Sequence, residues 1–298
     1  MSLFFTYPAH ILFYEPAREK SELWRFAVGL VMFAAIYAAL SLLFFQVMFS
    51  IAGSVPNLVR DIETGRTVLS MYLTLFSFVM MLISPAIVVR ILHRRSALSL
   101  FGPLTVAIPQ FFTVTVMLIA LGLVVAILPP WDMGGPLVPN MPFGRWALFL
   151  PLSLLAVLVQ VSGEEVFFRG YIQQQLAARY RTPWMWMVLP SLLFGLGHYI
   201  PAAAGENALT IAIWAGVFGL LMADLTARAG SIGPAIAVHF CNNVSAILIV
   251  SMPDQLSGLA LYLAPFGLED AEMLGAWLPV DFAMMFVSWL AARLALRR

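Results

Sequence analysis

The chain has 298 residues, of which 62% are hydrophobic and only 10% are charged. Soluble domains carry about 25% charged residues, so this composition excludes a soluble globular protein and predicts an integral membrane protein. The formal net charge of +1 leaves no basic surface for nucleic acid, and the single Cys241 excludes an internal disulfide and a cysteine-rich zinc site.

Eight apolar runs are long enough to cross the hydrocarbon core of a bilayer, which takes about 20 helical residues. They cover residues 26–49, 68–90, 105–128, 147–176, 184–203, 208–226, 232–251 and 278–295. The sequence therefore predicts an all-α fold, a polytopic transmembrane bundle of about eight spanning helices in contact with membrane lipid. It shows no internal repeat and no low-complexity tract, so we expect residues 1–298 to form a single membrane domain.

Basic residues are distributed unevenly over the loops between these runs. If the runs alternate in direction, one side of the membrane receives Arg18, Lys20, Arg25, Arg90, Arg94, Arg95, Arg179, Arg181, Arg228, Arg293, Arg297 and Arg298. The other side receives only Arg60, Arg66 and Arg145. Because cytoplasmic loops are enriched in Lys and Arg, both termini are predicted to be cytoplasmic. Lysine contributes only Lys20 to the 16 basic residues, which favours a GC-rich bacterial genome and so the bacterial inner membrane.

The fourth apolar run is interrupted by charge, in the stretch "VSGEEVFFRG" from Val161 to Gly170. An ionisable residue inside a span costs about 2.5–3.5 kcal/mol on insertion scales, so such residues usually face the bundle interior and have a function. Glu165 and Arg169 are spaced i,i+4 with the acid first, the orientation that favours an ion pair on one helix face. We expect Arg169 to hold Glu165 ionised and in place, which leaves Glu164 free to act.

Two later runs each contain a histidine with a partner at the same helical spacing. His198 follows Phe194 in "FGLGH", and His239 precedes Asn243 in "HFCNN". At a rise of about 1.5 Å per residue, Glu164 and His198 lie roughly 20 Å from the predicted cytoplasmic boundary and His239 roughly 15 Å. The polar residues of three helices are therefore expected to meet at similar depth.

These residue types suit the hydrolysis of an amide. A carboxylate and a histidine can share a water molecule and take its proton, and a second histidine with an asparagine can donate hydrogen bonds to the developing oxyanion. The expected reaction needs no serine or cysteine nucleophile. The substrate is then a peptide or protein at the membrane.

The three motifs "EEVFFR", "FGLGH" and "HFCNN" resemble, in order, the EExxxR, FxxxH and HxxxN motifs of the CAAX protease and bacteriocin-processing family. This family of intramembrane endopeptidases is also called the ABI or type II CAAX prenyl endopeptidase family. The resemblance covers residues 147–250, which we expect to be the motif-bearing protease core. It implies that Glu164 and His198 activate water and that His239 and Asn243 form the oxyanion hole.

Other interpretations stay open at this stage. Buried Glu and His residues also make proton relays, so a proton-coupled transporter is an alternative, although transporters tend to show internal repeats. A catalytically inactive membrane scaffold is another alternative, which the completeness of all three motifs disfavours. Glu164, His198 and His239 could also form a zinc site with an open water position. We favour the metal-free mechanism, because Asn243 beside His239 suits a donor role.

Further ionisable residues receive a structural interpretation. Asp224 and Arg228 are spaced i,i+4 at a helix end and are expected to form a surface ion pair. Asp281 lies near the start of the last apolar run and is expected to be a helix-start acid. His10 and His93 lie near the membrane interfaces and are assigned no role.

Overall fold

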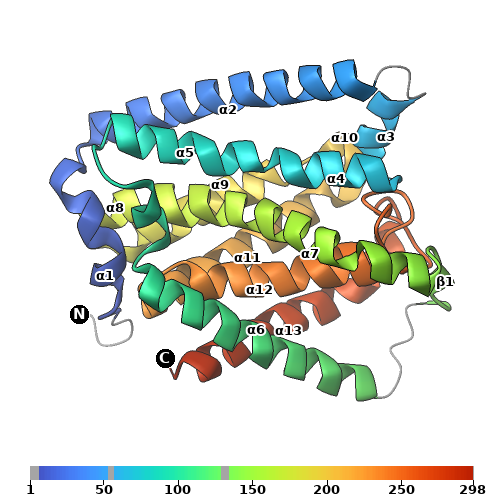
Figure 1. Ribbon diagram of the computed structural model, residues 1–298. Helices are drawn as coiled ribbons and strands as arrows, with labels where there is room; N and C mark the ends of the chain where they lie inside the picture. The colour runs from blue at the N-terminus through green and yellow to red at the C-terminus, as the bar shows by residue number, and fades with distance from the viewer. Residues whose placement is uncertain (1–6, 53–56, 129–133, 298) are drawn as a thin grey trace.

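A computed structural model describes residues 7–52, 57–128 and 134–297, and it shows a bundle of long helices running side by side (Figure 1). The longer α-helices are α2 (Leu23–Ala52), α4 (Val68–Ser77), α5 (Val79–Ile91), α6 (Leu104–Ile127), α7 (Phe143–Glu165), α9 (Leu189–Gly197), α11 (Ala208–Ala229), α12 (Gly233–Asn243) and α13 (Ala271–Leu296). The short ones are α1 (His10–Tyr14), α3 (Leu58–Thr64), α8 (Gln174–Arg179) and α10 (Pro201–Ala204).

Tighter and wider helical turns join these helices. The 3₁₀ segments are η1 (Glu15–Lys20), η2 (Ala97–Phe101) and η5 (Gly205–Asn207), and the π-helical segments are η3 (Val166–Gln173), η4 (Trp184–Val188) and η6 (Val244–Ile249). Three two-residue strands, β1 (Val138–Pro139), β2 (Val250–Ser251) and β3 (Tyr262–Leu263), form a small sheet in the order β1-β3-β2. The predicted all-α fold is confirmed.

Six helical stretches in the described part of the chain are long and apolar enough to cross a membrane. They are Leu23–Ile51, Val68–Ile91, Ala97–Ile127, Phe143–Arg179, Pro201–Ala229 and Ala271–Leu296. The fifth and seventh predicted runs correspond to shorter apolar helices, Trp184–Gly197 and Gly233–Ile249. The predicted number of about eight is therefore approximate, because these two segments fall short of full spanning length.

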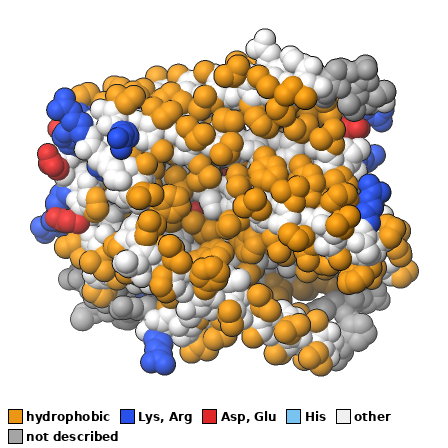
Figure 2. All heavy atoms as spheres, in the orientation of Figure 1, with side chains coloured by type: hydrophobic (Ala, Val, Ile, Leu, Met, Phe, Trp, Pro, Cys, Tyr) orange, Lys and Arg blue, Asp and Glu red, His pale blue; other side chains and the backbone are white. Residues whose placement is uncertain are grey.

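The surface has the polarity that a bilayer requires. Charged side chains gather at the two ends of the bundle, and hydrophobic side chains cover the face between them (Figure 2). Large apolar side chains in the middle of the long helices are strongly exposed, among them Leu42 of α2 at 72% and Val116 of α6 at 66%. Because an exposed apolar surface of this extent would be unfavourable in water, it is the surface that contacts lipid.

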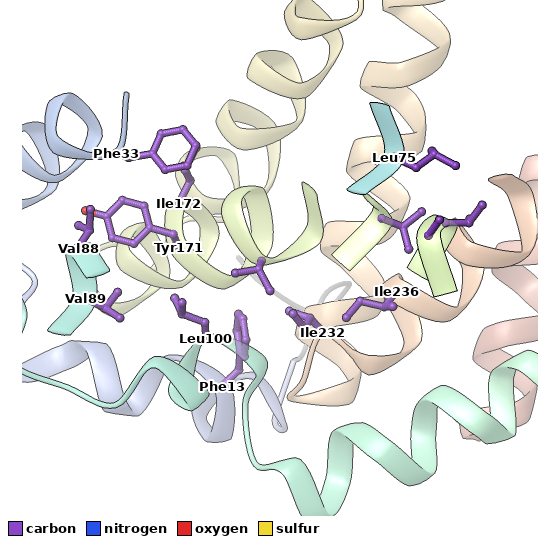
Figure 3. Packing of buried hydrophobic residues seen from close by; sticks show 14 of the residues in the cluster. Phe13, Phe33, Leu75, Val88, Val89, Leu100, Tyr171, Ile172, Ile232 and Ile236 are labelled. Atoms are coloured by element: carbon purple, nitrogen blue, oxygen red, sulfur yellow. The ribbon is translucent and has the colours of Figure 1, made fainter. Parts of the chain in front are cut away.

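The main core fixes η3, the segment that follows the paired glutamates. Tyr171 and Ile172 of η3 pack with Phe33 of α2 and with Val88 and Val89 of α5 (Figure 3). The Tyr171 hydroxyl lies 3.1 Å from His93 Nε2, so its one polar atom has a partner within this apolar cluster. Packing against α2 and α5 therefore holds η3, the segment that contains Arg169, in place.

Both termini lie at the same end of the bundle, opposite to β1 (Figure 1). Asp224 ties this end together, because its carboxylate accepts hydrogen bonds from Tyr7 Oη at 2.8 Å, from Trp289 Nε1 at 3.0 Å and from Arg228 Nε at 2.8 Å. The expectation of a surface ion pair is wrong, since the side chains from the segment before α1 and from α13 close over Asp224 and leave the residue only 7% exposed.

Candidate active site

The predicted site residues come from three helical segments that meet inside the bundle. Glu164 and Glu165 are the last two residues of α7, and Arg169 lies one turn later in η3. His198 caps the C-terminal end of α9, and His239 and Asn243 lie on one face of α12. The π-helical η3 begins directly after Glu165, and π-helical turns inside α-helices are frequent at functional sites.

Glu165 and Arg169 form a buried ion pair. Arg169 Nη1 donates to Glu165 Oε1 at 3.0 Å, and the side chains are 1% and 0% exposed. Arg169 Nη2 donates to the carbonyl oxygen of Gly219 in α11, also at 3.0 Å. The ion pair that the i,i+4 spacing predicts is thus present. The additional hydrogen bond to Gly219 connects η3 with α11.

His239 lies between the two adjacent carboxylates. Its Nδ1 is 2.9 Å from Glu165 Oε1, and its Nε2 is 3.3 Å from Glu164 Oε2. Carboxylate oxygens only accept hydrogen bonds, so both ring nitrogens can donate only when the imidazole carries two protons. Two carboxylates, one guanidinium and one imidazolium then sum to zero charge, which suits a site buried at membrane depth.

A second polar chain leads from Glu164 towards α12. Gln160 Nε2 donates to Glu164 Oε2 at 2.9 Å, and Asn243 Nδ2 donates to Gln160 Oε1 at 2.8 Å. Asn242 Nδ2 donates in turn to Asn243 Oδ1 at 3.1 Å. Glu164 stays outside the ion pair with Arg169, but Gln160 and His239 both contact one of its oxygens.

Gln160 is the site residue that sequence reasoning missed. It is 7% exposed and connects Glu164 with Asn243, two residues of different helices. The signal was present in the sequence: a glutamine four residues before Glu164, in an otherwise apolar stretch, lies on the same helix face.

His198 occupies the more open side of the site. Its Nδ1 lies 2.9 Å from the carbonyl oxygen of Phe194, which can only accept, so Nδ1 carries the hydrogen and Nε2 is left as an acceptor in the neutral ring. The buried Phe194 ring separates this histidine from the ion pair, with centroids 4.5 Å from His198 and 6.1 Å from His239, and it lies 4.8 Å from the Arg169 guanidinium carbon.

The two glutamates differ in access. The side chain of Glu164 is 11% exposed, whereas that of Glu165 is 0% exposed. Arg169 and His239 both contact Glu165 Oε1, and its side chain has no exposed surface, so Glu164 is the one of the two carboxylates with a small exposed surface. Glu164 can therefore act as a base, while the buried carboxylate of Glu165 holds Arg169 and His239 in place.

A zinc set of Glu164, His198 and His239 does not assemble in the described part of the chain, where no three His, Cys, Asp or Glu residues come close enough to hold a metal ion. His239 directs both ring nitrogens at the two carboxylates, and His198 Nδ1 is bonded to the backbone.

The protein is thus an integral membrane helical bundle with a buried cluster of carboxylates and imidazoles, and one segment of it resembles a known family. Residues 146–245 match the family model for the Rce1-like type II CAAX prenyl endopeptidases, so this segment of the chain is similar to that family. The resemblance predicted from the three motifs is thereby confirmed.

A relative from Bacillus subtilis (strain 168), "Uncharacterized protein YyaK", is 21% identical over 259 residues, which cover 83% of this chain and 84% of that protein. No solved structure matches the chain. The family match supports a CAAX-type intramembrane protease.

Proposed function

We propose that this chain is an intramembrane endopeptidase that hydrolyses a peptide bond with Glu164 as the general base. The observation that carries the proposal is the difference between the adjacent carboxylates: Glu165 is fully buried in an ion pair, whereas the side chain of Glu164 is 11% exposed and is contacted by the Gln160 amide and the His239 imidazole. A general base must reach a water molecule, so Glu164 fits this role and Glu165 positions its neighbours.

In the proposed first step, Glu164 accepts a proton from water while the water oxygen attacks the carbonyl carbon of the scissile bond. His198 Nε2 accepts the hydrogen bond from the second water hydrogen and so orients the oxygen. The electron pair of the carbonyl moves onto its oxygen, and a tetrahedral intermediate with one negative charge forms.

The charge on the intermediate is met by donors of α12. When Glu164 becomes protonated, its attraction for the His239 Nε2–H weakens, and this donor becomes available to the oxyanion. Asn243 donates one amide hydrogen to Gln160 and has a second one to offer. Glu164 then returns its proton to the leaving nitrogen as the C–N bond breaks, which regenerates the carboxylate.

The test is cleavage by purified protein in proteoliposomes, with Glu164→Gln beside the wild type. The amide preserves the size of the side chain but cannot take a proton, so we expect cleavage to be lost while the variant inserts and accumulates normally. Turnover by Glu164→Gln close to that of the wild type would remove Glu164 from the role of base.

The orientation of the chain is a further part of the proposal. Both termini lie at one end of the bundle, and the predicted loops at this end contain twelve basic residues against three at the other. We propose that this end is cytoplasmic. Reporter fusions after Arg298 and near Asp270 test it, and a cytoplasmic signal at Asp270 would contradict the eight-segment topology.

A further inference from the structure

A groove of about 490 Å³ lies beside the candidate active site, between α6, α11, α12 and α13. This volume is within the range of about 300–1,000 Å³ that is typical of ligand sites. Its walls are mostly apolar, with aromatic side chains from α11 and α13 and polar side chains from α12 and η6. It shares a wall with the active site, because Phe218 lines the groove and its ring centroid is 5.0 Å from that of His239.

Asp281 is the one acidic residue of the groove wall, and the wall residues that the structure describes include no Lys, Arg or His. The expectation of a helix-start acid is wrong: α13 begins at Ala271, so Asp281 lies about 15 Å further along the helix, well inside the span. Its side chain is exposed, and within the described ranges no side chain forms a hydrogen bond or an ion pair with it. A carboxylate at this depth is costly unless a cation pairs with it.

Aromatic side chains accompany this carboxylate. Trp277 lies one helical turn before Asp281, and both line the groove. Trp214 of α11 also lines it, and its indole is stacked on Phe218 with centroids 5.5 Å apart and planes inclined by 9°. Trp214 Nε1 is buried and has no hydrogen-bond partner among the described residues. Indole faces next to a carboxylate form a favourable environment for a cationic group.

The groove is connected to the catalytic residues by hydrogen bonds. Asn242 lines it and donates to Asn243, which bonds to Gln160, which bonds to Glu164. A peptide lying in the groove thus contacts Asn242 at one end of the chain of hydrogen bonds that holds Glu164. The groove is therefore placed to receive residues of the substrate next to the bond that is cut.

We propose that this groove is a specificity subsite for the side chain of a lysine or arginine in the substrate, with Asp281 as its counter-ion. The apolar walls and the indoles of Trp214 and Trp277 accommodate the aliphatic stem, and the carboxylate pairs with the charged end. This inference rests on the proposed endopeptidase function. It assigns a substrate class to that site: an apolar peptide segment with one basic residue close to the scissile bond.

The experiment uses full-length protein in proteoliposomes and a set of apolar fluorogenic peptides that carry either lysine or norleucine at each position in turn. Norleucine keeps the aliphatic stem and removes the charge. Three variants accompany the wild type: Asp281→Asn removes the groove charge, Asp281→Glu retains it, and Glu272→Gln removes an exposed charge near the start of the same helix.

We expect lysine at one position to raise kcat/KM by at least about 10-fold over norleucine in the wild type, in Asp281→Glu and in Glu272→Gln. In Asp281→Asn the ratio of kcat/KM for the lysine peptide to that for the norleucine peptide should fall to about one, while Glu272→Gln cleaves both peptides at the wild-type rate. A lysine preference that persists in Asp281→Asn, or the absence of any preference in the wild type, would overturn the proposal.

A binding measurement keeps this proposal separate from the catalytic one. Tryptophan fluorescence of the Glu164→Gln protein reports peptide binding without turnover, and Asp281→Asn is added in that background. If no protein cleaves any peptide, the endopeptidase function fails, but tighter binding of the lysine peptide that depends on Asp281 still supports the subsite. Equal binding of the lysine and norleucine peptides refutes the subsite whether or not cleavage occurs.

Discussion

The buried pair of Glu165 and Arg169 provides the sharpest test of the charge balance in this site. In Glu165→Gln the guanidinium of Arg169 stays 1% exposed, keeps its hydrogen bond to the Gly219 carbonyl oxygen and loses its counter-ion. Removing one partner of a buried ion pair costs about 3–5 kcal/mol, because the remaining charge is neither paired nor solvated. His239 loses an ionised acceptor at Nδ1 as well, so this range is a lower bound.

The pair of Glu15 and Arg18 supplies a matched control within the same chain. Its side chains are 53% and 55% exposed, so Glu15→Gln should cost at most about 1 kcal/mol. One kcal/mol shifts Tm by about 2–4 °C in chains of 150–250 residues. We therefore expect Glu165→Gln to lower the unfolding midpoint by on the order of 10 °C or more, and Glu15→Gln by a few degrees at most.

The assay is thermal unfolding in one detergent at one scan rate, since unfolding of membrane proteins is often irreversible. The double variant Glu165→Gln with Arg169→Gln removes both charges and should unfold at a higher temperature than Glu165→Gln alone. If Glu165→Gln unfolds within 2 °C of the Glu15→Gln control, the reasoning from buried charge is refuted.

Three other predictions concern the oxyanion donor, helix packing and pH. Asn243→Ala should lower kcat by about 10²–10³ with little change in KM and no rescue by added zinc; an unchanged kcat would exclude it as a donor. Gly195→Ala should lower Tm clearly more than Gly197→Ala, because an added Cβ at Gly195 meets the Ala212 carbonyl oxygen at 2.7 Å, whereas the one at Gly197 meets nothing within 4 Å; equal midpoints would contradict the close helix contact. Burial lowers the pKa of His10 from 6.5 to about 3, so between these pH values the unfolded chain binds a proton at His10 that the folded chain does not. The contribution of His10 to stability is therefore complete above pH 6.5 and is lost at ~1.4 kcal/mol per pH unit as the pH falls towards 3. Urea titrations at pH 7 and pH 5 should show this loss in the wild type and a smaller one in His10→Phe.

Interactions within one helix could be predicted from the sequence. The spacing of Glu165 and Arg169 sets their relation, because i,i+4 side chains lie on one face whatever the surrounding structure is. The eight apolar runs likewise follow from composition, since a bilayer requires continuous apolar segments. Both predictions depend on distances along the chain that helix geometry fixes.

Interactions between helices could not be predicted in the same way. That His239 would meet Glu165 as well as Glu164, and that Asn243 would bond to Gln160, depends on the rotation and relative depth of α7 and α12, which spacing within each helix leaves open. The misinterpretation of Asp224 has the same cause. Its spacing to Arg228 was right, but the sequence carries no local sign that Trp289 closes over it.

The separation of Glu164 and His239 along the chain has a consequence for biosynthesis. Glu165, Arg169 and Glu164 leave the ribosome together, whereas His239 follows Glu165 by 74 residues. At a synthesis rate of about 5–20 residues per second, roughly 4–15 s pass between the synthesis of Glu165 and that of His239. During this interval Arg169 balances only one of the two carboxylates. A nascent chain arrested before α12 thus carries an unbalanced acid at membrane depth, a feature that membrane quality-control proteases and insertases can act on before synthesis ends.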